Sequence, residues 1–109
     1  MFIATEIALQ LVADVRPIAE AVQPRDKNLA DQMRRASSSA ALNTAEGGRR
    51  VGGDRHHSFR IASAEAAETV VAVRIAVAQG YVVAAAIAPV LATEDRLQAV
   101  LHRLRNPRR

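Results

Sequence analysis

The segment from Asp54 to Gln79 most constrains what this chain can fold into. It runs for 26 residues without Gly or Pro, and from Val70 to Ala78 only Arg74 is polar. Its apolar side chains recur at helical spacing on two faces. One face holds Phe59, Ala62, Ala66, Val70, Val73 and Val77, and the second holds Ile61, Ala64, Ala72, Ile75 and Ala78. A helix that is apolar nearly all round is buried on several sides. We predict a long helix that another subunit covers; the alternative is that alanine here simply tolerates water.

Residue usage extends this prediction to the whole chain. The 109 residues include 23 Ala but only three aromatic residues, Phe2, Phe59 and Tyr81. Strands need β-branched and aromatic side chains, whereas Ala has the best intrinsic helix propensity. The length suggests a single domain, and a thin Ala-rich core of this size favours burial between subunits. We therefore predict an all-α fold that forms a homo-oligomer.

Four helical segments with short connections predict an antiparallel up-down four-helix bundle. The expected helices span about residues 3–22, 27–47, 54–79 and 83–105, and a basic tail follows at 106–109. The side chains expected to point inward from the first, second and fourth are Ile7, Leu11, Val15, Ile18, Val22, Leu29, Met33, Ala36, Ala40, Ile87, Val90, Leu97, Leu101 and Leu104.

Capping and breaking residues set the expected helix ends. Asp26 and Asp54 are expected N-caps, and Gly47-Gly48 is expected to stop the second helix. Pro17 predicts a kink or a break in the first helix. At Pro89 two outcomes stay open: a kinked helix, or a helix that starts near Ala88 with the proline in its first turn.

Several function classes find no support in the sequence. The absence of Cys excludes disulfides and thiolate zinc sites. No catalytic motif, cofactor motif or metal-ligand spacing is present, and the glycine-rich segment 47–53 lacks the Lys-Ser/Thr of a phosphate-binding P-loop. The apolar run 81–92 is too short to span a bilayer, and residues 2–13 lack the basic start of a signal peptide. We expect a non-enzymatic cytoplasmic protein without cofactor, metal or membrane partner.

Positive charge is concentrated in two parts of the chain. Lys and Arg total 15 against 11 acidic residues, and all the basic residues except Lys27 are Arg. Residues 25–60 carry a net +4 and residues 96–109 a net +5, whereas the other two parts are net acidic. Arg offers a fork of donors that fits phosphate, so these segments favour salt-dependent binding of RNA or DNA. The alternative is a charged surface that only keeps the protein soluble, and sequence alone does not show whether the two segments meet.

A polar face on the second helix is the other notable pattern. Gln32, Ser39, Asn43, Glu46 and Arg50 share one side of that helix. We predict a partly buried structural role for this face, with a solvent-facing stripe as the alternative. Glu68 is expected to pair with an Arg of a neighbouring helix.

These residues carry a family resemblance. Residues 29–36, followed by Ser39-x-x-x-Asn43-Thr44-Ala45-Glu46-Gly47, resemble the four-helix-bundle proteins encoded by intervening sequences in bacterial ribosomal RNA genes. Residues 59–62, Glu68 and Ala76-x-x-x-Gly80-Tyr81 match in order and spacing, so that the resemblance covers about residues 5–105.

The resemblance implies a ring-like homopentamer of antiparallel bundles. It also implies kinship with accessory proteins of diversity-generating retroelements, which bind nucleic acid and contact a reverse transcriptase. RNA or DNA, and a reverse transcriptase or another protein, are thus the expected partners besides the chain itself; the alternative is a scaffold ring with no nucleic-acid role. The signature residues expected to be structural are Ser39, Asn43, Glu46 and Gly47. The residues expected to bind nucleic acid are Arg34, Arg35, Arg49, Arg50, Arg55, Arg60, Arg103 and Arg105.

Overall fold

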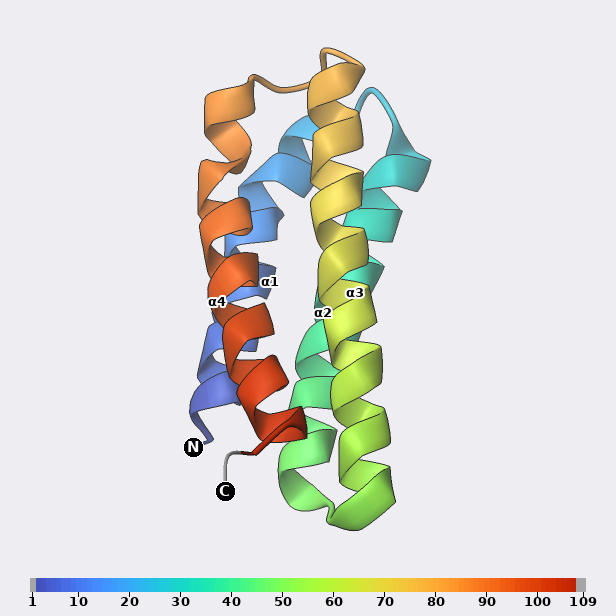
Figure 1. Ribbon diagram of the computed structural model, residues 1–109. Helices are drawn as coiled ribbons and strands as arrows, with labels where there is room; N and C mark the ends of the chain where they lie inside the picture. Colours follow the sequence, from blue (N-terminus) through green and yellow to red (C-terminus); the bar gives the residue numbers. More distant parts are fainter. Residues whose placement is uncertain (1, 108–109) are drawn as a thin grey trace.

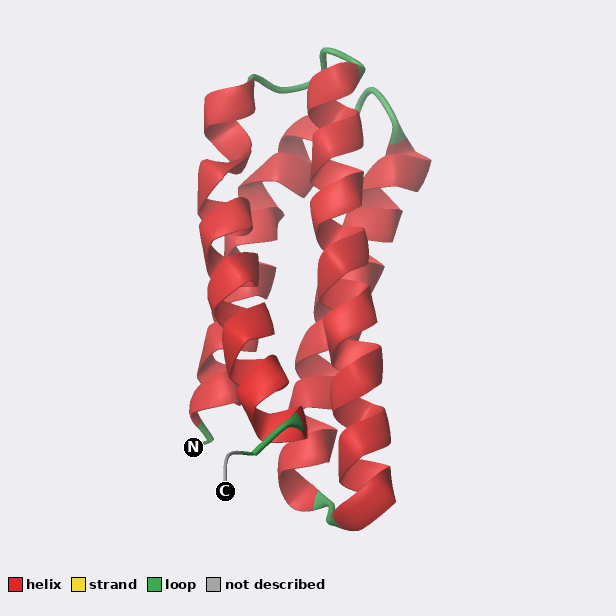
Figure 2. Cartoon of the chain, viewed as in Figure 1, coloured by secondary structure: helices red, strands yellow, loops and turns green. Residues whose placement is uncertain are grey.

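A computed structural model describes residues 2–107, which form four long helices and one short helix (Figure 1). The elements are α1 (Ile3–Val22), α2 (Lys27–Arg49), α3 (Gly52–Ala78), the 3-10 helix η1 (Ala84–Ile87) and α4 (Ala88–Arg105). Short loops join them, and residues 2–107 contain no strand (Figure 2). The prediction of an all-α chain with four helices is confirmed for these residues. Arg108 and Arg109 of the expected basic tail lie outside them.

The four helices lie side by side in an elongated bundle of 46 × 21 × 21 Å. Each helix packs mainly on its neighbours in the sequence, α4 closes against α1, and α1 and α3 barely touch across the diagonal. The chain therefore runs up and down in turn. The start of α1, the α2–α3 turn and the end of α4 share one end of the bundle (Figure 1).

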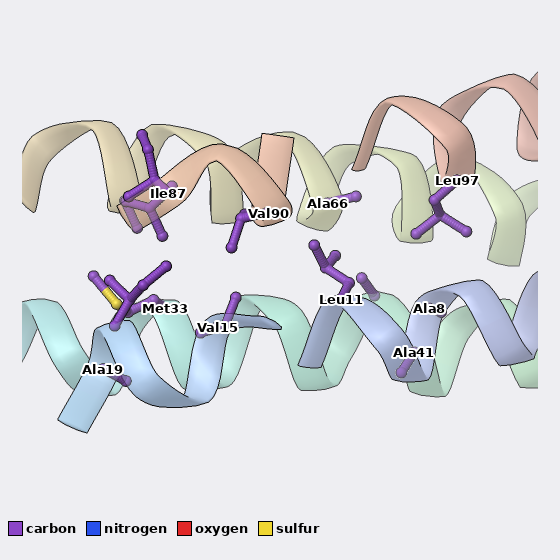
Figure 3. Close-up of a cluster of buried hydrophobic side chains, with 14 of the residues drawn as sticks. Ala8, Leu11, Val15, Ala19, Met33, Ala41, Ala66, Ile87, Val90 and Leu97 are labelled. Carbon is purple, nitrogen blue, oxygen red and sulfur yellow. The ribbon is translucent and has the colours of Figure 1, made fainter. Parts of the chain in front are cut away.

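The interior is a continuous apolar core that all four helices line. Figure 3 shows Leu11, Val15 and Met33 facing Val90 and Leu97 across the bundle. Every side chain predicted to point inward from α1 and α2 is buried, as are Phe59 and Val73 of α3. Leu104 is only half-buried, because it lies in the last turn of α4.

Two predicted helix ends are wrong. Gly47 and Gly48 do not stop α2, which continues to Arg49. Gly47 instead gives room to a neighbour, since a Cβ there would overlap the Phe59 ring. The left-handed backbone conformation that favours glycine occurs at Gly52, with φ 62°, where α3 begins. Asp54 is not the N-cap of α3: Val51 is, and Asp54 lies exposed in the first turn.

Other local predictions hold or are now decided. Asp26 caps α2, its Oδ1 accepting a hydrogen bond of 3.0 Å from the Leu29 amide. Pro17 lies exposed inside α1 and does not break the helix. Of the two outcomes at Pro89, the second is observed, because α4 starts at Ala88.

Hydrogen bonds between side chains and neighbouring helices fix the register of the bundle. Thr93 Oγ1 of α4 donates to Asp14 Oδ2 of α1 at 2.5 Å. Gln98 Nε2 of α4 donates to the Ser63 carbonyl of α3 at 2.8 Å. At the far end, the Tyr81 hydroxyl donates to Asp26 Oδ2 at 3.1 Å, and this bond raises the pKa of Tyr81. Within residues 2–107, no helix combines the length and apolar character needed to cross a membrane.

Candidate nucleic-acid interface

Six arginines, five from three helices and Arg50 from the α2–α3 turn, gather where α2 ends, α3 begins and α4 ends. We call this the basic end. The hydrogen bond between Gln98 and Ser63 shows which residues of α3 and α4 lie side by side. Because the two helices are antiparallel and have the same rise per residue, residues 56–60 of α3 lie beside residues 101–105 of α4. The α2–α3 turn lies at the same end (Figure 1). Residues 49–60 of the first basic segment therefore meet residues 101–105 of the second. The arginines are Arg49, Arg50, Arg55, Arg60, Arg103 and Arg105.

Only one of these arginines forms an ion pair with a described residue. Arg50 Nε lies 3.3 Å from Glu46 Oε1, and its Nη1 lies 4.0 Å from Asp54 Oδ2. The other five make no ion pair within residues 2–107. Arg105 Nε is buried and has no hydrogen-bond partner there. Among residues 2–107, only Glu6 in the first turn of α1 brings a further carboxylate to this end besides Glu46 and Asp54. The basic end thus carries excess positive charge.

Arg55 lies over two aromatic rings. Its guanidinium carbon is 5.9 Å from the centre of the Phe2 ring and 5.2 Å from that of Phe59. The two rings are stacked with their centres 6.2 Å apart. The rings attract the cation and hold it in place. The sequence gives a signal for half of this arrangement, because Arg55 and Phe59 are one helical turn apart, but the approach of Phe2 depends on the fold.

Arg34 and Arg35 lie away from the basic end. Arg35 is about 20 Å from Arg49 along α2, at 1.5 Å per residue. Arg34 Nη1 lies 3.7 Å from Asp31 Oδ1 and faces the groove between α1 and α2. Arg35 faces the opposite groove, between α2 and α3. The structure therefore does not bring these two predicted phosphate ligands to the others.

A groove between α2 and α3 also lies away from the basic end. Its volume is about 510 Å³. The side chains that line it are Gln32, Arg35, Ala36, Glu65, Glu68, Val71, Ala72 and Ile75. Partial burial and the neighbouring charge of Glu68 raise the pKa of Glu65. Glu68 shares the groove with Arg35 but forms no ion pair within residues 2–107.

Comparison with models of known families identifies the family of this chain. The model of the 23S rRNA-intervening sequence protein family matches residues 2–103. The chain belongs to this family. The resemblance seen in the sequence is thereby confirmed over nearly the whole length of the chain.

A solved structure agrees on the fold. It is the crystal structure of a protein of unknown function from the S23 ribosomal protein family of Bacteroides thetaiotaomicron. It superposes on this intervening sequence protein with a TM-score of 0.84 at 15% identity, covering 94% of this chain and 98% of the other. At that identity the likeness shows the fold alone. No curated protein matches the chain.

The signature residues of this intervening sequence protein follow one another along α2. Asn43 Nδ2 donates to the Ser39 carbonyl at 2.9 Å and lies 3.3 Å from Ser39 Oγ. Glu46 pairs with Arg50 one turn further on, and Gly47 lies under Phe59. Ser39, Asn43 and Glu46 are half-buried. The hydrogen bond of Asn43 and the ion pair of Glu46 run along α2 to its C-cap, whereas Ser39 also faces Glu65 of α3.

The histidines of this intervening sequence protein add to the polar surface of the basic end. His56 and His57 follow Arg55 on α3, His102 precedes Arg103 on α4, and all three are exposed. Over residues 2–107, no three His, Asp or Glu side chains lie close enough together to hold a metal ion.

Proposed function

We propose that this protein binds RNA or DNA through the phosphates, using the basic end. The observation that carries the proposal is that five arginines from three helices share one end of the bundle without an ion pair to a described residue. A guanidinium presents a planar fork of donors that fits phosphate oxygens and stays charged at any physiological pH. Contacts of this kind position a nucleic acid without reading its bases. The role is binding rather than catalysis, in the cytoplasm and without a cofactor.

We further propose that the chain acts as a homo-oligomer. The predicted second apolar face of α3 supports this: Ala64, Ile75 and Ala78 are exposed, Ile61 is half-buried, and only Ala72 is buried. Val71 and Ile75 beside the α2–α3 groove are 56% and 39% exposed in the single chain. The family resemblance favours a ring-like pentamer. Rotation about a ring axis would repeat the basic end in every subunit and strengthen its field.

A protein partner is the second candidate. The α2–α3 groove, with apolar side chains beside Glu65, Glu68 and Arg35, favours it. By resemblance to retroelement accessory proteins, a reverse transcriptase is the kind of protein expected. A ring that only binds protein would keep its assembly and show no affinity for RNA or DNA.

Loss of two basic-end charges is expected to weaken nucleic-acid binding strongly. In the Arg49→Gln/Arg103→Gln variant the affinity for a 20-base-pair RNA or DNA duplex should fall about tenfold or more at 100 mM salt. The salt slope, which is the fall of the logarithm of the binding constant with the logarithm of the salt concentration, should decrease by about 0.9 for each lost phosphate contact. Fluorescence anisotropy over a salt series measures both quantities.

The matched control is Arg16→Gln/Lys27→Gln. It removes the same charge from two exposed ion pairs remote from the basic end. Its affinity should stay within about twofold of the wild type. Equal losses in both variants would show that net charge alone matters, and no binding to any duplex at low salt would overturn the proposal.

Assembly is expected to depend on the exposed face of α3. Sedimentation velocity at micromolar concentration should give the wild type a mass of about five times 11.7 kDa. Val71→Lys should shift the protein toward monomer, because it places a charge on an apolar face that the neighbouring subunit covers. Val83→Lys changes a valine that is 71% exposed in the loop before η1, and should leave the mass unchanged. A wild type that is monomeric would contradict the homo-oligomer.

A further inference from the structure

We infer that the basic end binds double-helical nucleic acid in preference to unpaired strands. This inference rests on the proposed function and names its substrate class. Proteins that prefer single strands generally offer aromatic side chains on which the splayed bases stack. Proteins that bind only the backbone respond instead to the density of phosphate charge. The partners of the aromatic rings and the shape of the basic end decide between these two modes.

The aromatic residues of this chain are already engaged. Tyr81 lies at the opposite end of the bundle, bonded to Asp26 and lying under Arg25, whose guanidinium carbon is 5.1 Å from the ring centre. Phe59 is fully buried. Phe2 is half-buried, stacked on Phe59 and approached by Arg55. With only three Phe, Tyr or Trp residues in the whole sequence, the basic end offers an unpaired base no free phenyl, phenol or indole ring. Its exposed rings are the smaller imidazoles of His56, His57 and His102.

The other side chains of the basic end offer charge rather than base recognition. Arg49, Arg60 and Arg103 are exposed and carry donors without acceptors. Asn106, the side-chain amide at the end of α4, donates to the His102 carbonyl at 3.1 Å. What remains available to a ligand is a set of guanidinium groups with the exposed imidazoles of His56, His57 and His102.

The width of the bundle favours a duplex, rather than a single strand, as the ligand whose phosphates face the arginines. The cross-section measures 21 × 21 Å, and the arginines come from three helices across it rather than from one line. A duplex carries one phosphate per ~1.7 Å of axis and a single strand one per ~3.4 Å. A segment as long as the bundle is wide therefore carries about twelve phosphates on the two strands of a duplex and about six on a single strand, so the duplex presents the denser negative charge. Each neutralised phosphate also releases more counterions from a duplex, about 0.9, than from a single strand, about 0.7.

The test compares a mixed-sequence 20-base-pair DNA duplex with a 20-nucleotide oligothymidine. The full-length wild type should bind the duplex about tenfold more tightly at 50 mM salt, with the steeper salt slope, as expected for about five phosphate contacts. Equal or tighter binding of the oligothymidine would overturn the inference while leaving the proposed function intact. Binding of neither ligand would overturn the proposed function itself.

A second variant tests the aromatic argument directly. Phe2→Leu keeps an apolar side chain in contact with Phe59 but removes the ring. The affinity for the two ligands should change by the same factor, because Arg55 keeps its contact with Phe59 and its charge acts on both. Circular dichroism should show the same helix content as in the wild type. A selective fivefold loss for oligothymidine would identify Phe2 as a stacking platform and overturn the inference. Arg103→Gln is the positive control, because it should weaken binding of both ligands.

Discussion

Replacing Gly47 by valine is expected to lower the free energy of unfolding by about 2–3 kcal/mol, the cost of overpacking a close contact. Gly47 lies inside α2, and a side chain there would overlap the ring of the fully buried Phe59. Phe59 is held between the helices and has no open space to move into. Urea denaturation followed by circular dichroism measures the loss.

Gly53→Val is the matched control for Gly47→Val. Gly53 is also helical, but a Cβ there meets no atom within 4 Å. Its free energy of unfolding should change by no more than about 0.5 kcal/mol. If Gly47→Val lowered the free energy of unfolding no more than this control does, the close contact between Gly47 and Phe59 would not be needed for packing.

Replacing Phe59 by alanine is expected to cost about 3–5 kcal/mol, through lost burial and the cavity left behind. Phe59 joins α3 to α2 at Gly47, to the start of α1 at Phe2, and to the guanidinium of Arg55. Phe2→Ala should cost clearly less, because Phe2 is only half-buried. Equal losses in the two variants would contradict this assignment of the core.

A double-mutant cycle connects these two predictions. Gly47→Ala should destabilise the wild type but become neutral or stabilising in Phe59→Leu, where the smaller side chain leaves room. Alanine then brings its helix propensity, which exceeds that of glycine by about 1 kcal/mol. Additive effects would show that the two residues are not in contact.

The sequence predicted the helices well because their signals are local. Periodic apolar residues marked the inward faces of α1 and α2, and Asp26 marked the start of α2. Gly47 was misplaced because glycine has two uses, a left-handed helix end and a close approach. Nothing near it in the sequence distinguishes them; the deciding partner, Phe59, lies on another helix.

The candidate site depended more on the fold than on the sequence. Two Arg-rich segments were evident, but their meeting at one end follows from helix directions and lengths. The same geometry separates Arg34 and Arg35 from the other six and places them in two different grooves. The approach of Phe2 to Arg55 and Phe59 joins residues that lie more than 50 positions apart, so no local pattern predicts it.

Photo-cross-linking of a bound duplex, followed by mass spectrometry of the linked peptides, tests the central claim most directly. Cross-links are expected at residues 49–60 and 102–107, which form the basic end. These links should disappear as salt is raised. Cross-links concentrated instead at residues 23–31 and 79–89, the opposite end of the bundle, would contradict it.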